Sequence, residues 1–454
     1  MNVYSNILDM VGKTPMLEVK RIDTGPCRLF LKLELMKPGG SIKDRIGISM
    51  IEEAEKRGDI RPGDTIVEAT AGNTGLGLAL VAAQKGYHLV LVLPDKMSQE
   101  KIFNLRAMGA EVVLTRSDVG RGHPEYYQDL GRRIAGERGA YFINQFGNPD
   151  NPLAHETTTA PEILEQMGGD LDAIVLGVGS SGTVAGIGKY LKEHAPSVDI
   201  ILADPVGSVL TDYINKGVLG ESGSWLVEGI GEDFIPSIAD FDKVARAYAI
   251  SDAESFAAAR ELLHREGLLA GSSSGTLLAA ALKYCREQSE PKRVVSLACD
   301  TGNKYLSKLF NDFWMEDQGF IEREKFGDLR DLIGRPHSTH ATITVGPTDV
   351  LTTAHNRLRN AGFSQLPVMD ETGQLLGIVT EDTLIRFVYG KPELMSAPVA
   401  DAMESAFIKL DKGESMNNLV AMLRVQPYAA IMDGNEFLGL ITRSDVLNYL
   451  RRQI

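Results

Sequence analysis

A lysine at the end of a glycine-rich turn is the residue best suited to covalent chemistry in this sequence. Lys43 follows Pro38-Gly39-Gly40-Ser41-Ile42. Residues 29–34 alternate like a half-buried strand, and apolar residues recur at helical spacing over 46–54. The glycine pair lets the backbone come close to a ligand, and a lysine held there can form a Schiff base with a carbonyl cofactor. A lone surface lysine is usually only solvated, so this hypothesis needs support from other segments.

Three other loops contain residues suited to binding an anion; the first two join a strand-like run to a helix-like run, and the third lies ahead of a helix-like run. They are 70–75 (TAGNTG), 177–183 (GVGSSGT) and 270–275 (AGSSSG). Backbone amides at a helix start attract an anion, and Thr, Asn and Ser side chains add hydrogen-bond donors. An ordinary turn capped by Asn73 or Thr74 explains the first loop equally well, and a serine-rich helix start is often only a cap.

The second loop also matches the GxGxxG pattern of dinucleotide-binding folds, with Asp204 about 20 residues further on. An NAD-binding oxidoreductase is therefore an alternative from a different class. The hydroxyls of Ser180, Ser181 and Thr183 favour a terminal phosphate monoester instead, because a bridging pyrophosphate needs them less. An oxidoreductase would also leave Lys43 without a role.

The composition describes an acidic globular protein. The 454 residues allow about two to four domains, hydrophobic content is 43% and the net charge is −14. This charge argues against nucleic acid or an anionic membrane as the main partner. Cys27, Cys285 and Cys299 lie far apart without a CxxC pair, so we expect no disulfide framework and no zinc or dithiol site. Without a long apolar run or a signal-peptide pattern, we expect a cytoplasmic protein.

Near-continuous Val, Ile and Leu runs alternate with helical patterns through roughly the first two thirds of the chain. The runs include 65–69, 89–93, 111–114, 173–176, 200–203 and 294–297. Such runs are typical of parallel strands buried on both faces, and hence of an α/β architecture. Ligands bind beyond the carboxyl ends of such strands, where the three loops lie.

A set of short motifs recurs in a fixed order along this part of the chain. They are GKTP (12–15), PGGSIKDR (38–45), TAGNTG (70–75), NPLAHETT (151–158), GVGSSGT (177–183), VEGIGEDFIP (227–236) and SSSG (272–275). Together they resemble the fold-type II family of pyridoxal-phosphate (PLP) enzymes, in particular the cystathionine β-synthases and the related O-acetylserine sulfhydrylases. VEGIG with DFIP, and Phe313-Trp314-Met315, favour the synthases. The resemblance implies a catalytic domain at 1–315 with two α/β subdomains of open, mostly parallel sheets, the smaller inserted at roughly 41–143.

The resemblance also implies a role for each candidate site residue. Lys43 would form the Schiff base with PLP, Asn73 would hydrogen-bond the ring hydroxyl, and Ser273 would face the pyridine nitrogen. The phosphate would be held by Gly179, Ser180, Ser181, Gly182 and Thr183. The substrate would be bound by Thr70, Ala71, Gly72, Thr74, Gln145 and Glu228. No metal is expected.

The implied reaction is β-replacement, in which serine and homocysteine give cystathionine and water. Lys43, once released by the incoming amine, would act as base at the α-carbon and then as acid on the departing hydroxyl. A serine facing the pyridine nitrogen cannot hold a full positive charge there, so we infer moderate electron withdrawal that favours β-elimination over transamination. The same chemistry permits hydrogen sulfide release from cysteine. An O-acetylserine or O-phosphoserine sulfhydrylase making cysteine shares nearly every motif and is the nearest alternative.

The sequence departs from the family pattern at three places. Ala71 replaces the usual serine of the carboxylate loop, which removes one hydroxyl. Glu232 stands where animal synthases have tyrosine, which alters the entrance to the active site. The sequence begins about at the catalytic fold, without the N-terminal haem segment of the animal enzymes, so we expect no haem.

An internal repeat follows a charged segment that we interpret as a linker at 316–337. Residues 365–370 and 377–380 return as 428–433 and 439–442. The two copies, at about 338–393 and 396–454, each read strand, helix, strand, strand, helix. They resemble a tandem pair of CBS motifs, an α+β regulatory module at 338–454.

In relatives such modules bind adenosine-containing ligands through a Thr or Ser followed three residues later by Asp. The second copy keeps Thr442 and Asp445, whereas the first has Thr383 in place of the acid. The resemblance therefore implies at most one site, for S-adenosylmethionine or an adenine nucleotide. A packing and dimerisation module without a ligand is an equally good alternative. We expect a homodimer through the catalytic domains, with a tetramer or filament through the repeats as a further assembly.

Overall fold

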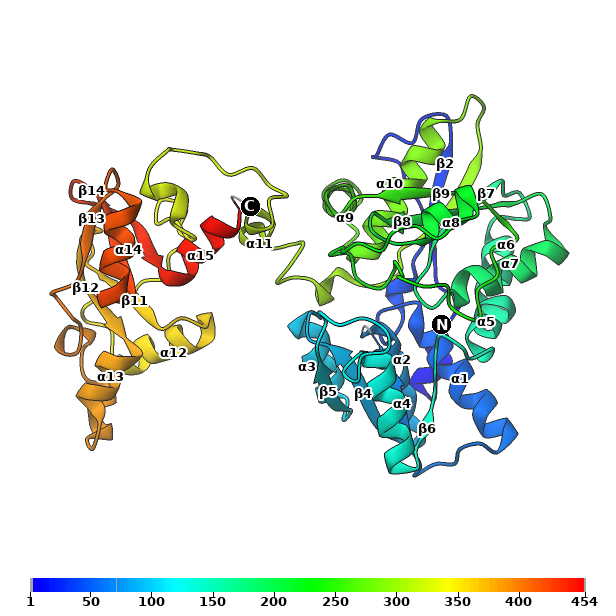
Figure 1. Cartoon of the computed structure of the whole chain (residues 1–454), viewed down its shortest axis with the longest axis horizontal. Helices are drawn as coiled ribbons and strands as arrows, with labels where there is room; N and C mark the ends of the chain where they lie inside the picture. The colour runs from blue at the N-terminus through cyan, green and yellow to red at the C-terminus, as the bar shows by residue number, and fades with distance from the viewer. Residues whose placement is uncertain (1–2, 71, 453–454) are drawn as a thin grey trace. The chain divides into compact units, whose positions relative to one another are not determined.

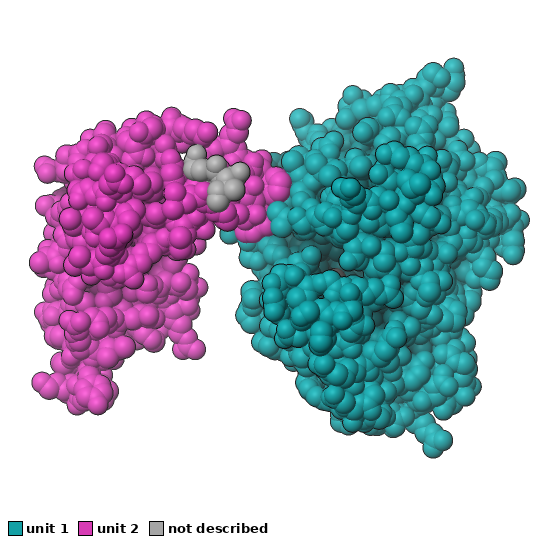
Figure 2. Space-filling view, viewed as in Figure 1, with its two compact units in different colours: residues 1–311 teal, residues 312–454 magenta. Residues whose placement is uncertain are grey.

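The computed structural model describes residues 3–70 and 72–452. The chain divides into two compact units, residues 1–311 and residues 312–454 (Figure 2). Within the described residues, no helix is long and apolar enough to cross a membrane.

Two sheets form the framework of the first unit (Figure 1). The larger has the order β1-β2-β10-β7-β8-β9; β1 is antiparallel to β2 and the other neighbours are parallel. The smaller has the order β5-β4-β3-β6 and is parallel. The prediction of two open, mostly parallel sheets is confirmed. The strands are β1 Met16–Glu18, β2 Arg28–Lys32, β3 Thr65–Ala69, β4 His88–Pro94, β5 Glu111–Thr115, β6 Tyr141–Phe142, β7 Ala173–Gly177, β8 Asp199–Pro205, β9 Val244–Ile250 and β10 Arg293–Leu297.

The second strand corrects one prediction from the sequence. The alternation at 29–34 predicts a half-buried strand, but Leu29, Leu31 and Lys32 of β2 are all almost completely buried. The reason is that β2 lies inside the sheet, between β1 and β10. Lys32 is tolerated there because its Nζ forms an ion pair with Glu162 (2.8 Å) and donates to the Thr14 carbonyl (2.7 Å).

Helices connect the parallel strands, as the α/β pattern requires. They are α1 Lys43–Arg57, α2 Asn73–Lys85, α3 Gln99–Ala107, α4 Tyr127–Arg138, α5 Asp150–Ala154, α6 Ala160–Gln166, α7 Gly182–His194, α8 Leu210–Lys216, α9 Asp252–Glu266 and α10 Ser272–Arg286. A π-helical turn, η3 (His155–Thr159), lies between α5 and α6. Three of the helices, α2, α7 and α10, begin within the three loops at 70–75, 177–183 and 270–275.

Two glycines set the position of the Lys43 turn. Helices α1 and α2 cross where Gly47 faces Gly77, and a Cβ on Gly77 would lie 2.5 Å from the carbonyl oxygen of Lys43. Only glycine permits so close an approach of two helix backbones. The crossing therefore holds the start of α1 against the helix that begins with Asn73.

The second unit contains the predicted repeat. In the first copy an isolated parallel bridge, Val345 to Val368, takes the place that β13 has beside β14 in the second. The antiparallel pairs β11–β12 and β14–β15 correspond. The elements are α12 Leu351–Ala361, β11 Gln365–Met369, β12 Leu375–Thr380 and α13 Glu381–Val388, then β13 Lys409–Asp411, α14 Met416–Val425, β14 Tyr428–Asp433, β15 Glu436–Thr442 and α15 Arg443–Arg451.

The segment interpreted as a linker contains structure of its own. Residues 312–317 form α11 (Asp312–Asp317) and residues 329–332 form a 3₁₀ turn, η5 (Leu329–Leu332). Leu329, Leu332 and Ile333 are buried in the apolar cluster of the second repeat. At least this part of 316–337 thus packs into the unit rather than bridging freely to it.

Candidate active site

One cavity in the first unit, of about 370 Å³, collects the predicted site residues. It lies where the loops after β3, β7 and β10 meet, at the carboxyl ends of strands from both sheets. Ala71 is outside the described residues, and Gly72 is not among the lining residues. The predicted residues that line it are Lys43, Thr70, Asn73, Thr74, Gln145, Gly179, Ser180, Ser181, Gly182, Thr183, Glu228 and Ser273. Their individual roles stay predictions.

Lys43 is the first residue of α1 and lines this cavity. Burial lowers the pKa of Lys43, and the charge of Lys101 acts in the same direction, whereas Cys299 and Asp300 oppose it. A lower pKa increases the neutral fraction of the amine, the form that attacks a carbonyl. The position therefore suits a Schiff-base lysine.

The loop 177–183 forms an anion cradle at the start of α7. Ser181 adopts a left-handed φ of +72°, and its buried Oγ has no hydrogen-bond partner. Asn151 Nδ2 donates to Ser180 Oγ (2.9 Å), and a side chain on Gly182 would collide with Asn151. An unpartnered hydroxyl at the N-terminus of a 13-residue helix fits the phosphate of PLP.

His155 lies beside the loop 177–183 and supports it as an uncharged side chain. Its Nε2 lies 3.3 Å from Thr183 Oγ1 and its Nδ1 lies 3.0 Å from Thr159 Oγ1. Burial lowers the pKa of His155 well below its usual value, helped by the charges of Lys43 and Arg45. The imidazole is therefore neutral and acts as a hydrogen-bonding support.

Ser273 lies in the first turn of α10 and lines the cavity. Its neighbours hold the helix start: Ser272 Oγ accepts from the Glu228 N–H (3.0 Å) and Ser274 Oγ accepts from the Cys299 N–H (2.9 Å). With a hydroxyl rather than a carboxylate at this position, a pyridine nitrogen would meet a neutral partner. The role of Ser273 stays a prediction.

Gln145 and Thr74 are tied together on the substrate side of the cavity. Thr74 Oγ1 donates to Gln145 Oε1 (2.7 Å), and Gln145 Nε2 donates to the Ala69 carbonyl (3.0 Å). These bonds fix the Gln145 amide beside the start of α2, whose free N–H groups can receive a carboxylate.

Glu228 has partners that sequence reasoning missed. Its Oε2 pairs with Lys101 Nζ and its Oε1 with Lys308 Nζ, each at 2.7 Å. Burial alone would raise the pKa of Glu228, but the two lysines lower it on balance. Both oxygens are thus engaged within the protein, and the predicted substrate contact of Glu228 would have to share them. Lys101 and Lys308 carried no signal in the sequence, because each is an isolated lysine in an ordinary polar segment.

Glu232 is one of the residues that line the cavity. Its N–H donates to Ser208 Oγ (3.1 Å). Burial raises the pKa of Glu232 well above its usual value, and the nearby Asp233 and Asp204 add to the effect.

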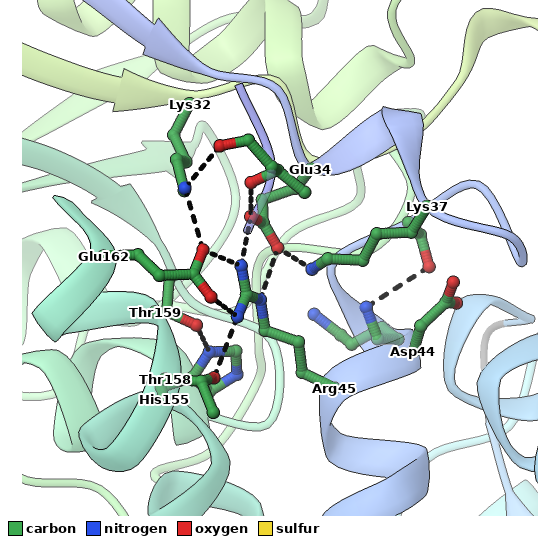
Figure 3. Close-up of polar contacts among 12 residues, drawn as sticks. Lys32, Glu34, Lys37, Asp44, Arg45, His155, Thr158, Thr159 and Glu162 are labelled. Atoms are coloured by element: carbon green, nitrogen blue, oxygen red, sulfur yellow. Dashed lines mark hydrogen bonds and ion pairs between the residues drawn. The ribbon is translucent and has the colours of Figure 1, made fainter. Parts of the chain in front are cut away.

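A buried ion network holds the turn before Lys43 (Figure 3). Arg45 donates through Nε and Nη2 to the two oxygens of Glu34, at 2.9 Å each, and pairs with Glu162 at 2.7 Å. Lys37 also pairs with Glu34. Asp44 Oδ2 accepts from the Gly39 N–H (2.7 Å). The network joins the glycine turn, α1 and α6, and so fixes the direction in which Lys43 leaves the turn.

We expect Glu68→Gln to stabilise the protein at high pH. Glu68 is buried at the end of β3, its Oε2 has no partner, and burial raises its pKa to about 8. Between about pH 4.5 and about pH 8 the unfolded chain releases this proton while the folded chain keeps it, so stability falls as pH rises. Glutamine cannot ionise.

Urea unfolding of the PLP-free protein measures the effect. The stability advantage of Glu68→Gln should grow by about 4 kcal/mol between about pH 5 and pH values above about 8. A difference that does not change with pH would contradict the assignment.

Comparison with known proteins agrees with this geometry. Residues 7–300 match the family model of pyridoxal-phosphate dependent enzymes, and residues 330–390 and 399–452 match CBS domains. The cystathionine beta-synthase of Oryctolagus cuniculus is 38% identical over 99% of this chain and 85% of its own length. The cysteine synthase of Staphylococcus aureus is 40% identical over 66% of this chain and 95% of its own length.

A solved structure gives the same result for the first unit. The O-acetylserine dependent cystathionine beta-synthase of Helicobacter pylori has a TM-score of 0.63 and 38% identity, covering 68% of this chain and 99% of its own. The resemblance stated from the motifs is confirmed. The chain is therefore a PLP-dependent enzyme that belongs to the cystathionine β-synthase family and carries a pair of CBS domains.

Proposed function

We propose that this enzyme joins L-serine and L-homocysteine to give L-cystathionine and water by PLP-dependent β-replacement. The observation that carries the proposal is the convergence of Lys43, Asn73, the cradle at 177–183 and Ser273 on a single cavity. Bound PLP would withdraw electrons from the α-carbon of the amino acid, which makes the α-proton acidic and the β-substituent a leaving group. The chain's relation to the synthase family over nearly its whole length supports the choice of reaction.

Residues of the chain carry out the proton transfers and hold the substrate. Lys43 Nζ takes the proton from the α-carbon and delivers it to the departing β-hydroxyl, so that water leaves. The start of α2, with Thr74 and Gln145, holds the substrate carboxylate so that the α-proton faces Lys43. Lys43 Nζ then takes the proton of the incoming homocysteine thiol, the sulfur adds to the β-carbon, and Lys43 delivers that proton to the α-carbon.

Product identification tests this proposal. The PLP-loaded protein is offered isotope-labelled serine with unlabelled O-acetylserine, homocysteine and sulfide, and the products and their label are identified by mass spectrometry. Cystathionine with the serine-derived carbon skeleton as the dominant product is expected. Cysteine formed mainly from O-acetylserine would overturn it.

The nearest alternative is an O-acetylserine or O-phosphoserine sulfhydrylase. It is favoured by the cysteine synthase relative, which matches the first unit at 40% identity. Cystathionine formed from O-acetylserine would be an intermediate outcome. Homocysteine would still be the attacking thiol, and only the leaving group would change, from hydroxide to acetate. Hydrogen sulfide formed from cysteine and homocysteine would be a further reaction of the same site.

For the second unit we propose one adenosine-ligand site at Thr442 and Asp445. Asp445 Oδ2 accepts from the Thr442 N–H (2.7 Å) and Oγ1 (2.5 Å), which caps α15. Thr380 and Thr383 form the equivalent cap in the first copy, without a carboxylate. The hydroxyls of a ribose need a strong hydrogen-bond acceptor, and of the two copies only the second has a carboxylate at this position, that of Asp445. We therefore propose a single site.

Calorimetry with S-adenosylmethionine, AMP, ADP and ATP tests this second proposal. We expect one ligand to bind at one site per chain, and Asp445→Asn to weaken it by about ten-fold or more. Asparagine keeps an oxygen for the helix cap, so the melting temperature should change little. Flat titrations with all four ligands would leave only a structural role for the repeats.

A further inference from the structure

The amide of Asn73 is held on both sides by charged groups far away in the sequence. Asn73 Nδ2 donates to Asp300 Oδ2 (2.8 Å), and Lys304 Nζ donates to Asn73 Oδ1 (3.1 Å). Asp300 and Lys304 are both buried, whereas Asn73 is partly exposed to the cavity. No short motif of the sequence contains either charged residue.

These two neighbours decide which way the amide points. A lysine ammonium can only donate, so it requires the oxygen of Asn73; a carboxylate can only accept, so it requires the nitrogen. A flipped amide would place an NH₂ group against an ammonium and an oxygen against a carboxylate in a buried site. The amide nitrogen has a second hydrogen, and it is the one donor of this group left for a ligand in the cavity.

The holding groups are themselves fixed. Lys304 Nζ also donates to the carbonyls of Gly39 (2.9 Å) and Gly40 (3.2 Å), in the turn before Lys43. Asp300 Oδ2 accepts from the Tyr305 hydroxyl (2.6 Å), which in turn accepts from Lys101 Nζ (3.0 Å). Lys304 therefore links the two segments that deliver Lys43 and Asn73, and Asp300 is part of a buried hydrogen-bonded chain.

We propose that Lys304 is a positioning residue which, together with Asp300, locks the Asn73 amide so that its nitrogen donates to the phenolic oxygen of PLP. The proposal rests on the cofactor site of the proposed function, but not on the identity of its substrates. A donor locked in this direction favours the ionised phenolic oxygen. Both the affinity for PLP and the visible absorbance of the bound cofactor then depend on Lys304.

The electrostatics of Lys304 agree with this role. Burial lowers the pKa of Lys304 to about 8, against the opposing charge of Asp300. The ammonium therefore begins to lose its proton just above neutral pH. The lock should weaken over that range, so the visible band should change with pH near 8 in the wild type and not in a variant without the lysine.

The test compares four proteins without any substrate: wild type, Lys304→Met, Asn73→Ala and the double variant. PLP is titrated into each apo-protein, and the visible spectrum of the loaded protein is recorded across pH. We expect Lys304→Met to raise the dissociation constant for PLP by about ten-fold and to shift the band to shorter wavelength. Because Lys304 acts through Asn73, the double variant should be no worse than Asn73→Ala.

Lys85→Met is the matched control, because Lys85 lies in the last turn of α2, the helix that begins with Asn73, and pairs with Glu52 and Glu55 rather than with Asn73. It should leave the band and the dissociation constant for PLP in place. If Lys304→Met does not fold, Lys304→Gln keeps an N–H donor without the charge and should give a smaller shift. An unchanged band and affinity in either variant, or effects that add fully to those of Asn73→Ala, would overturn the proposal. If the wild type showed no visible band after PLP is added, the proposed PLP site itself would be wrong.

Discussion

Lys43→Ala should lower turnover by at least about 10³-fold. The reason is that Lys43 Nζ is assigned both the removal of the α-proton and its delivery to the leaving group. Among the lining residues of the cavity, Lys96 and Lys308 are the other lysines, and Lys308 is engaged with Glu228. The rate of product formation from serine and homocysteine, followed by mass spectrometry, measures the effect.

Lys56→Ala is the control on the same helix. Lys56 lies in the last turn of α1, its side chain is 66% exposed, and its partner is Glu53. Turnover should stay within about two-fold of the wild type, because exposed pairs of this kind contribute little. Full turnover in Lys43→Ala would remove the central residue of the proposed mechanism.

Arg45→Met should destabilise the protein by about 3–5 kcal/mol. Arg45 is almost fully buried and holds two carboxylates, Glu34 and Glu162. Its removal leaves Glu162 with Lys32 and Glu34 with Lys37, so each buried carboxylate loses the guanidinium hydrogen bonds and keeps a single lysine partner. Urea unfolding of the PLP-free protein at neutral pH gives the free energy.

Arg138→Met provides the comparison. Arg138 is the last residue of α4, its side chain is 43% exposed, and it pairs with Glu111, whose side chain is 52% exposed. A much smaller loss of stability than for Arg45→Met is expected, because water replaces the lost contacts. If both variants lost the same small amount, the buried network would have no special role in holding the turn before Lys43.

Much of the fold could be predicted because the patterns are local. A run such as 173–176 is apolar throughout, which only a strand covered on both faces can bury, and it forms the greater part of β7. The repeat in the second unit is equally local, since each copy carries its own strands and helices. The alternation at 29–34 wrongly predicted a strand with one exposed face. Lys32 can be buried because it pairs with Glu162, which lies far away in the sequence and is not part of the local pattern.

The sequence by itself determined the elements, the loops that follow parallel strands, the repeat and the residue types suited to PLP, because each of these is written in a few neighbouring residues. Only the tertiary structure decided how the polar partners are matched. Asn73 meets Asp300 and Lys304 from more than two hundred residues away, and Glu228 meets Lys101 and Lys308. Such pairs have no period and no fixed spacing. They arise because the ends of strands from two sheets converge on one cavity, and that convergence exists only in the folded chain.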